Sequence, residues 1–490
     1  MDSGKENCKI VKGPSFRHAM ALFIKRNAIF LLLLTYSIAG LLTIIFFDGT
    51  GDNGDSIMHY LFARFAPVHP QLYLDHWAKP LFVLISSPFA QFGFNGMKVF
   101  NLCVTILTFY ITYLTGRSLR MQNPLLIVVF LICMPLYYIL TFSGLTEPFF
   151  AMFMIGAVFL AVRRKYIASA VAVSLMPFVR SEGLIIMLVF GCLFLANKQW
   201  KYLPWLLTGH VVYSIAGYFV FHDFLWVFNK IPYSSLVPKY GSGPLLHFVV
   251  QLNYVIGIPL YFLLIAGIIS YPVHWIKKNM VFSREETILV LFGFFIFLIA
   301  HSLFWYFGIF NSMGLKRVLI GVAPLISLIA LRGYNFVTNE LFRKPEMAGR
   351  VFGGLLAVYV IIFPFTGNHA SINWKNDMNQ TEEQTTAKAI ATYIKEHPMP
   401  PRNMFLYTYP YLSEVMNVDH FDGRLRKDLS RQNLDLLQHG DVVVWDNWFA
   451  VIESNTTLEN LLSCPGLVRE IDFDANVRGR EIKFVVFRKE

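Results

Sequence analysis

Long apolar runs recur along the first three quarters of this chain, and they constrain its fold more than any other feature. Of the 490 residues, 55% are hydrophobic and 15% are charged, and the mean hydropathy is +0.50. A run of about 20 apolar residues is long enough to cross a bilayer as a helix, whose backbone hydrogen bonds are satisfied internally. The sequence therefore predicts a polytopic α-helical membrane protein and excludes a string of soluble domains.

The predicted spans divide the chain into three parts. Residues 1–26 form a basic tail, and residues 27–366 form the transmembrane domain. In residues 367–490 charge returns and the apolar runs shorten, which predicts a separate domain outside the membrane. We expect about eleven spans. They cover 27–47, 97–115, 124–142, 148–162, two short segments within 166–197, 203–221, 248–273, 287–306, 315–331 and 351–366.

The formal net charge of +11 does not point to a nucleic-acid partner. The basic residues lie in the short links between spans, where the positive-inside rule places them in the cytoplasm. The N-terminus is therefore predicted to be cytoplasmic, and an odd number of spans puts the C-terminal domain outside. We expect a bacterial inner membrane rather than the endoplasmic reticulum, where the sequons at Asn379 and Asn455 would matter.

Residues 48–80 form a polar stretch between two apolar segments, with four aspartates and three histidines. Because a charge at membrane depth costs about 3 kcal/mol or more, a charged cluster at a membrane boundary is a functional-site hypothesis. A solvated outer loop is the alternative. Against it, apolar residues are spaced as one face of a short interfacial helix, with the polar face toward an external cavity. These residues are Ile57, Leu61, Phe62 and Phe65.

Charged residues near the outer membrane boundary are few and carry both signs. Several stand at the ends of different spans, so they could converge on one outward-facing cavity. Carboxylates there suit a general base, and basic residues suit an anion such as phosphate. The residues are Asp52, Asp55, Arg64, Asp75, Lys79, Glu147, Arg180, Glu182, Lys230, Lys239, Lys316 and Arg317.

The C-terminal part of the chain is predicted to form a small α/β domain on the outer face. Residues 381–396 predict a helix, and short β-type runs at 403–408, 441–446 and 482–487 predict strands. No catalytic motif stands out in this domain, so docking or capping is its expected role. The long loop 222–247, rich in Pro, Gly, Ser and Tyr, fits a mobile lid or a gate for the acceptor.

Four short runs stand at the outer ends of predicted spans. They are Asp55-Ser56-Ile57-Met58-His59-Tyr60, His76-Trp77-Ala78-Lys79-Pro80-Leu81, Thr146-Glu147-Pro148 and Arg180-Ser181-Glu182-Gly183. In order and sidedness they resemble motifs of the GT-C superfamily of integral-membrane glycosyltransferases, which includes protein O-mannosyltransferases and lipid A aminoarabinose transferases. The first run is similar to the family's Asp-Glu-x-x-Tyr/His motif. Ser56 stands where the family has a second acid, which leaves Asp52 as a substitute for that acid.

The resemblance implies that a sugar is transferred from a polyprenyl phosphate to an acceptor hydroxyl at the outer face. The acceptor proton needs a base, for which Asp55 is the first candidate, followed by Asp52 and Glu147. The leaving phosphate needs positive charge, and Arg180 is the first candidate because Arg binds phosphate through two parallel hydrogen bonds. Further candidates for substrate or phosphate binding are Lys79, His76, His59, Lys316 and Arg317.

Structural roles stay open for some of these residues. Arg180 and Glu182 could simply pair with each other, and Glu147 could stabilise a helix N-terminus. His59 and His76 could be ordinary polar residues of the interface. A Mg²⁺ or Mn²⁺ site among the aspartates and histidines also stays open, because their spacing is not diagnostic.

Two other classes of protein stay open as alternatives to the enzyme. A lipid or polysaccharide transporter or flippase would place ionisable groups near the membrane midplane, between pseudo-symmetric halves. This chain instead clusters them at one face and has no internal repeat. A membrane scaffold with an outer binding domain would leave the region of Asp55 dispensable. For an enzyme, the sequence does not specify the sugar or whether the acceptor is a glycan, a lipid or a protein.

Overall fold

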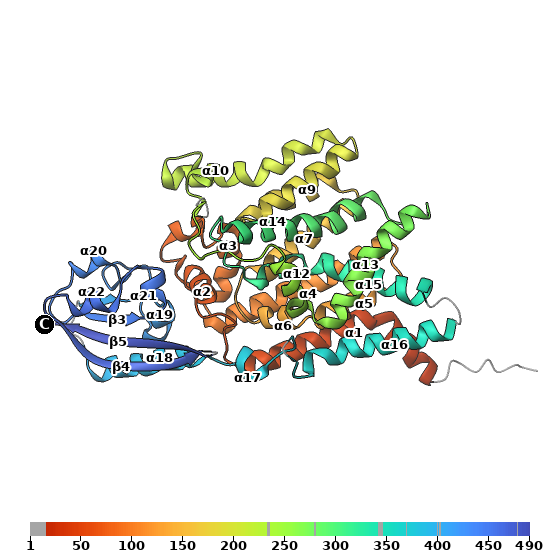
Figure 1. The fold of residues 1–490 in the computed structure, drawn as a ribbon. Helices are drawn as coiled ribbons and strands as arrows, with labels where there is room; N and C mark the ends of the chain where they lie inside the picture. The colour runs from red at the N-terminus through yellow and green to blue at the C-terminus, as the bar shows by residue number, and fades with distance from the viewer. Residues whose placement is uncertain are drawn as a thin grey trace, which may run out of the picture.

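The computed structural model describes residues 16–490, apart from 233–235, 279–280, 342–345, 369, 399, 401–402 and 478. A bundle of helices makes up most of the molecule, and a small sheet domain formed by the C-terminal part of the chain sits at one end of it (Figure 1). The predicted polytopic helical fold with a C-terminal α/β domain is confirmed. Of the predicted tail 1–26, residues 1–15 lie outside the described residues, and helix α1 (Phe16–Phe46) already begins at Phe16.

Seven segments among the described residues are long and apolar enough to cross a membrane. They coincide with seven of the predicted spans. The segments are residues 27–46 of α1, α4 (Gly93–Ser118), Trp200–Phe221 with α10 (Thr208–Phe221), α13 (Ile258–Ile276), Glu286–Phe307 with α14 (Gly293–Phe307), Lys316–Glu340 with α15 (Ala323–Phe336), and Met347–Phe365 with α16 (Glu346–Ile362).

The remaining predicted spans are short or interrupted helices. The predicted span 124–142 is broken where Pro135, which cannot donate a backbone hydrogen bond, follows an extended Met134. One of the seven coinciding spans, the predicted 248–273, is also divided, at Gly257, whose φ is +82°, so that α12 precedes the longer α13. The helices concerned are α5 (Leu125–Ile132), α6 (Pro135–Thr141), α7 (Glu147–Val162), α8 (Tyr166–Leu175), α9 (Gly183–Ala196) and α12 (His247–Ile256).

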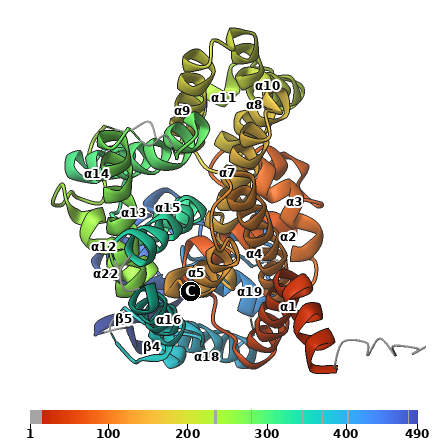
Figure 2. The same ribbon diagram turned by 90° about the vertical axis from the view of Figure 1, so that its right-hand side faces the viewer.

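Helix α15 lies at the centre of the bundle (Figure 2) and is the most buried of the seven segments, with 83% of its apolar window inside the protein. Helix α13 packs along it. A Cβ added at Gly267 of α13 would lie 2.0 Å from the carbonyl oxygen of Ile329, and one at Gly333 of α15 would lie 1.9 Å from that of Leu263. The two backbones can therefore approach only because both positions are glycine.

The predicted interfacial helix is α2 (Asp55–Phe65), followed by the 3₁₀ turn Pro70–Leu74 and by α3 (Pro80–Ala90). Its apolar face is buried as expected. However, this apolar face packs against protein and does not simply face lipid, since the ring of Phe62 lies 4.7 Å from that of Phe421 in the C-terminal domain. Helix α2 is therefore held between the bundle and the sheet domain.

The C-terminal domain is a five-stranded mixed sheet with the strand order β2-β1-β3-β5-β4. Strands β1, β2 and β3 are parallel, whereas β5 pairs antiparallel with both β3 and β4. The predicted helix and all three predicted strands are present, and β2 and β4 were not predicted. The elements are α17 (Trp374–Asp377), α18 (Glu382–Glu396), β1 (Phe405–Leu406), α19 (Tyr411–Met416), β2 (Arg426–Lys427), α20 (Arg431–Leu434), β3 (Val442–Asp446), α21 (Phe449–Ile452), α22 (Leu458–Leu462), β4 (Leu467–Val477) and β5 (Arg480–Lys489).

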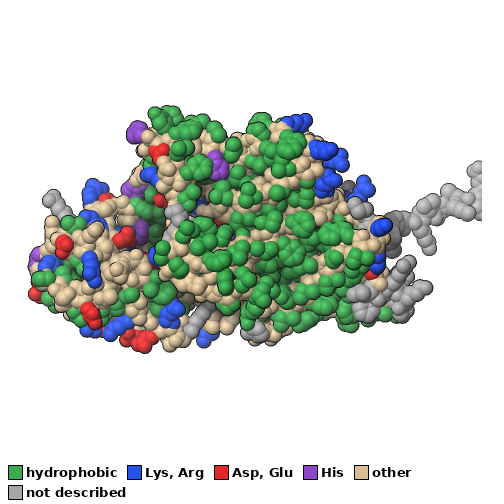
Figure 3. Space-filling model, turned by 45° about the horizontal axis from the view of Figure 1, so that its top comes forward, with side chains coloured by type: hydrophobic (Ala, Val, Ile, Leu, Met, Phe, Trp, Pro, Cys, Tyr) green, Lys and Arg blue, Asp and Glu red, His purple; other side chains and the backbone are tan. Residues whose placement is uncertain are grey.

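The surface of the bundle carries a broad apolar area (Figure 3). Lys and Arg side chains gather at the end of this area opposite the C-terminal domain, which itself carries charges of both signs. Helices α4, α7 and α9 run toward that basic end, and Arg120, Arg163 and Lys198 follow their last residues. Such an apolar belt is typical of a surface that faces lipid.

Candidate functional site

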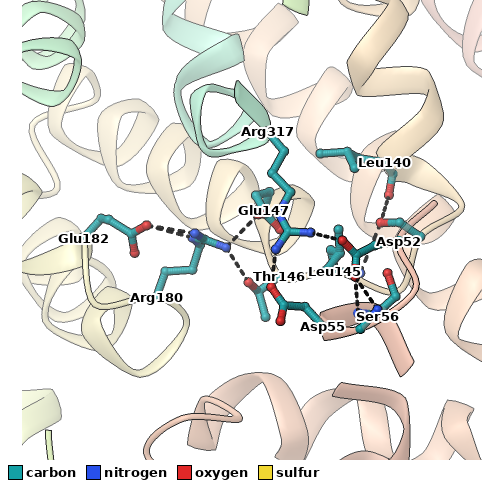
Figure 4. A network of polar contacts seen from close by, with 12 residues as sticks. Asp52, Asp55, Ser56, Leu140, Leu145, Thr146, Glu147, Arg180, Glu182 and Arg317 are labelled. Carbon is teal, nitrogen blue, oxygen red and sulfur yellow. Dashed lines mark hydrogen bonds and ion pairs between the residues drawn. The ribbon is translucent and has the colours of Figure 1, made fainter. Parts of the chain in front are cut away.

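Four segments that are far apart in the sequence meet in one network of charged side chains (Figure 4). This network borders a cavity that residues of the C-terminal domain also line. The four segments are the loop after α1, the first turn of α7, the turn before α9, and the 3₁₀ turn Lys316–Val322 that leads into α15. Each contributes at least one charged side chain. The assembled residues are Asp52, Asp55, Glu147, Arg180, Glu182 and Arg317.

Arg317 joins three carboxylates at the centre of this cluster. Its Nη1 donates to Oδ2 of Asp52 at 2.6 Å, and its Nη2 donates to Oδ2 of Asp55. Its Nε lies 3.3 Å from Oε1 of Glu147. Because a guanidinium presents its N–H groups in a rigid plane, Arg317 fixes the directions of these carboxylates relative to one another. It therefore ties the loop before α2 to the central helix α15.

Arg180 forms a second junction beside the first. Its Nη1 lies 2.9 Å from Oε1 of Glu147 and donates to Oγ1 of Thr146 at 2.8 Å, and its Nη2 donates to Oε1 of Glu182 at 2.8 Å. The Arg180–Glu182 pair that the sequence left open is thus present, but Arg180 also contacts α7. The carboxylate of Glu147 is fully buried and is balanced by both guanidinium groups, since an unpaired buried charge would be strongly unfavourable.

The two aspartates of the first loop have different surroundings. Oδ1 of Asp52 accepts hydrogen bonds from the backbone N–H groups of Gly54 at 2.9 Å and Ser56 at 3.4 Å. Although burial opposes the effect, Arg317 and these N–H groups lower the pKa of Asp52. Desolvation raises the pKa of Asp55 against the pull of Arg317, and the carboxylates of Asp52 and Glu147 add to the rise. Asp52 is therefore held as an anion, whereas Asp55 has a stronger tendency to take up a proton.

Asp55 is also the most accessible carboxylate of the cluster. Its side chain is 43% exposed, compared with 29% for Asp52 and 0% for Glu147. Ser56, which stands where the GT-C motif has a second acid, is fully buried, and its hydroxyl has no hydrogen-bond partner among the described residues. Position 56 therefore offers no second base. The nearby acid is Asp52, whose carboxylate accepts a hydrogen bond from the backbone N–H of Ser56.

The structure places His59 and Lys79 beside this cluster. His59 lies one turn after Asp55 on α2, stacked on Trp77 with ring centroids 5.0 Å apart. Burial and the nearby cations of Arg180 and Lys79 lower its pKa to about 3, so the ring is neutral at pH 7. Its Nδ1 has no hydrogen-bond partner among the described residues.

Lys79 connects two of the four quoted sequence runs. Its Nζ donates to Oγ of Ser181 at 2.9 Å and to the backbone oxygen of His76 at 3.1 Å. Its backbone φ is +72°, a region that residues other than glycine rarely occupy and that is often found at functional sites. Burial lowers its pKa to about 8, which leaves the ammonium largely protonated at pH 7.

Two further predicted residues have contacts outside the charged cluster. Nε2 of His76 donates to the carbonyl oxygen of Val227 at 2.9 Å, in the short helix α11 (Trp226–Asn229). Nζ of Lys316 lies over the ring of Tyr254 in α12, 5.2 Å from its centroid. The hydrogen bond of His76 connects loop 48–80 to the loop after α10, whereas Lys316 directly precedes Arg317 and faces α12.

A ready set of metal ligands is not found at this site. Among the described residues, no group of three or more His, Cys, Asp or Glu side chains is arranged to hold a metal ion. Asp52 and Asp55 face a guanidinium group instead. The residues present therefore do not fit a resident Mg²⁺ or Mn²⁺ in this arrangement.

A cavity of about 520 Å³ opens directly above the cluster, between the bundle and the C-terminal domain. Asp52, Asp55 and Arg317 line its membrane side. The opposite wall is formed by residues of the C-terminal domain that the sequence analysis did not identify, and Tyr240 of the loop 222–247 lines it as well. The wall residues include Thr381, Glu383, Gln384, Trp448, Phe449 and Arg480.

Comparison with known proteins gives a result for the fold alone. No protein-family model and no curated protein matches the sequence. Among solved structures, ArnT from Cupriavidus metallidurans bound to undecaprenyl phosphate superposes with a TM-score of 0.59 and 10% sequence identity, over 94% of this chain and 98% of that chain. This chain has the GT-C fold. The GT-C-like fold that was expected from the resemblance is thereby confirmed.

Solved structures of two further GT-C glycosyltransferases also superpose on this chain. The oligosaccharyltransferase of Archaeoglobus fulgidus gives a TM-score of 0.51 at 11% identity, over 86% of this chain and 70% of that chain. Arabinofuranosyltransferase AftD from Mycobacteria gives 0.52 at 11% identity, over 93% of this chain and 40% of that chain. At such identities the GT-C likeness does not assign the role of any residue, so these roles have to be argued from the site itself.

Proposed function

We propose that this chain is a membrane glycosyltransferase that moves a sugar from a polyprenyl phosphate to an acceptor hydroxyl, with Asp55 as the general base. One observation carries the proposal. An accessible carboxylate with a raised pKa lines a cavity at the end of a GT-C bundle, next to two partly buried arginines. The site thus combines a base for the acceptor proton with cations for the leaving phosphate.

In the proposed reaction the acceptor oxygen attacks the anomeric carbon of the sugar from the face opposite the phosphate. The new carbon–oxygen bond forms as the bond from the sugar to the phosphate breaks, with inversion at the anomeric carbon. The acceptor proton passes to Asp55, and the polyprenyl phosphate leaves with the electron pair. Arg317, which binds Asp52 and Asp55, orients the base without itself changing charge.

We assign the phosphate to the side of the cluster formed by Arg180, Lys79 and His59. Two cations and a neutral imidazole with an unpaired nitrogen would surround it there. Charge-assisted hydrogen bonds of this kind are stronger than neutral ones and act most where negative charge develops. The bound undecaprenyl phosphate of the ArnT structure supports a lipid phosphate of this class for the present chain.

We also propose that the site and the C-terminal domain face away from the cytoplasm, in a bacterial inner membrane. The basic end of the bundle, where Arg120, Arg163 and Lys198 follow their helices, would then lie in the cytoplasm. The polyprenyl donor would reach the cavity from the outer leaflet.

The function is tested by incubating the purified protein in nanodiscs with a panel of polyprenyl-phosphate sugars. We expect the sugar of at least one donor to be transferred to water or to an added acceptor, with release of polyprenyl phosphate. If none of the donors is hydrolysed or transferred, the assignment as a glycosyltransferase fails.

A further inference from the structure

The C-terminal domain is bonded to the loop that carries the proposed base. Asn53, which lies between Asp52 and Asp55, donates from Nδ2 to Oε2 of Glu383 at 2.6 Å. Gln384 donates from Nε2 to Oγ1 of Thr50 at 2.8 Å. The wall of the cavity opposite the cluster is therefore held in a fixed position relative to Asp55.

Three buried polar atoms in this part of the domain have no hydrogen-bond partner among the described residues. They are Oε1 of Glu383, Oδ2 of Asp446 and the hydroxyl of Tyr409. Glu383 is 4% exposed and lines the cavity, and Asp446 is 1% exposed. Most buried polar atoms in folded proteins are hydrogen-bonded, so the unpaired Oε1 of Glu383, the one of the three whose residue lines the cavity, points to a group that is supplied from outside the chain.

Aromatic rings stand next to these polar atoms. The ring of Phe449 stacks on Tyr409 with centroids 5.0 Å apart, and the guanidinium of Arg480 lies 4.3 Å from the centroid of Trp448. Phe449, Trp448 and Arg480 all line the cavity. An apolar ring surface beside carboxylates suits a ligand that has both a ring face and hydroxyl groups.

We propose that this wall of the C-terminal domain binds the acceptor, and that the accepting group is a hydroxylated ring, that is, a carbohydrate. The proposal rests on the proposed function and names the substrate class for the same site. The pKa of Glu383 is raised to about 7 by burial, with Asp446 and Asp52 adding to the rise, so this side chain can donate to or accept from a hydroxyl near neutral pH.

Shape and chemistry separate this acceptor from the alternatives. A cavity of about 520 Å³ is within the range of about 300–1,000 Å³ found for small-molecule sites, and residues of the C-terminal domain form much of its lining. A lipid alcohol would place hydrocarbon against the buried carboxylates, which is unfavourable. A sugar presents several hydroxyl donors to the Glu383 carboxylate, whereas a peptide backbone presents one N–H donor per residue and a carbonyl oxygen that an ionised carboxylate cannot bind.

The test compares acceptor use in the wild type and in two matched variants of α18. Glu383→Gln keeps an oxygen for Asn53 but removes the carboxylate. Glu382→Gln changes the neighbouring residue, which accepts from the backbone N–H of Asn476 and does not line the cavity. The acceptors are a panel of methyl glycosides, a Ser/Thr peptide and a long-chain alcohol, and hydrolysis of the donor by water is measured separately.

We expect transfer to at least one methyl glycoside. Glu383→Gln should raise its KM by about tenfold to a hundredfold, the scale of one hydrogen bond to a charged group, and donor hydrolysis should change less than about threefold. Glu382→Gln should behave as the wild type. Transfer to the peptide or the alcohol alone, an unchanged KM, or an equal fall of hydrolysis and transfer would overturn the proposal. Hydrolysis without any transfer would also overturn it, whereas a wild type without donor hydrolysis or transfer contradicts the proposed function itself.

Discussion

Among single residues, Arg317 has the largest number of partners in the charged cluster, since it binds Asp52 and Asp55 and lies against Glu147. Three carboxylates so close together repel one another unless a cation lies between them. The position of Arg317 therefore sets the direction of the proposed base, while its charge opposes the rise that burial causes in the pKa of Asp55.

Arg317→Lys tests this geometry without changing the charge. A lysine ammonium is a compact point charge and cannot reproduce three planar contacts, so at least one carboxylate would lose its partner. We expect the transfer rate to fall by about a hundredfold or more and the melting temperature to drop. The rates are measured with saturating donor in nanodiscs, and melting is followed in the same preparation. Near wild-type rates would show that the bridging geometry is not needed.

The raised pKa of Glu383 leads to a separate prediction, which concerns the dependence of folding stability on pH. Its pKa is raised from 4.5 to about 7 in the folded protein, so the folded state prefers the protonated form. Its contribution to stability is complete below about pH 4.5 and is lost as the pH rises toward 7. Glu383→Gln removes this loss, so the melting temperature of the variant relative to the wild type should rise between pH 5 and pH 8. A difference that does not depend on pH would contradict the raised pKa.

At the scale of helices, the contact between α13 and α15 positions the site, because α15 follows directly on the turn that carries Arg317. This contact depends on two glycines that face backbone atoms. It could not be predicted from the sequence, because nothing in the apolar runs indicates which helices are neighbours.

Gly333→Ala should separate these helices. The added Cβ would lie 1.9 Å from the carbonyl oxygen of Leu263, so we expect a loss of about 1–3 kcal/mol in stability and a lower transfer rate. Gly354→Ala in the exposed part of α16 is the control, because a Cβ there has no atom within 4 Å and alanine favours helix. The melting temperatures of the two variants should move in opposite directions. Equal shifts would contradict the packing account.

The C-terminal domain shows what local pattern can and cannot predict. Strands β3 and β5 were predicted because they are short apolar runs, and α18 because of its helical periodicity. Strand β4, with the sequence LVREIDFDANV, was missed because charged residues interrupt its pattern and most of it is not fully buried. Glu383 was missed for another reason, since only the packing of the domain against loop 48–80 brings it to the cavity.

For the whole molecule, the helical membrane fold was predictable because each span is a local apolar run. Breaks within a span, such as the one at Gly257, were not predictable. The gathering of four quoted runs at one end was inferred from their order and predicted sidedness. The individual contacts, such as Arg317 with Asp55, join residues more than 250 positions apart and could not be read from the sequence.

The orientation in the membrane is predicted by the charge at the two ends. In a cysteine-free background, Gly423→Cys in the C-terminal domain should react with a membrane-impermeant maleimide in intact spheroplasts. Lys165→Cys after α7 should react only when the membrane is permeabilised, because the positive-inside rule places it in the cytoplasm. The opposite labelling pattern would contradict both the orientation and the outward-facing site.

The most direct test of the central claim, that Asp55 is the general base, compares Asp55→Asn with the wild type in transfer rate and donor affinity. Asparagine keeps the size of the side chain but cannot take up the acceptor proton, so the rate should fall by about 10² to 10⁴. Donor affinity should stay nearly the same, because a general base acts mainly in the transition state. Asp419→Asn, which changes a carboxylate paired with His69 away from the cluster, should leave both unchanged. Near-normal transfer by Asp55→Asn would contradict the account and make Asp52 or Glu147 the next candidate.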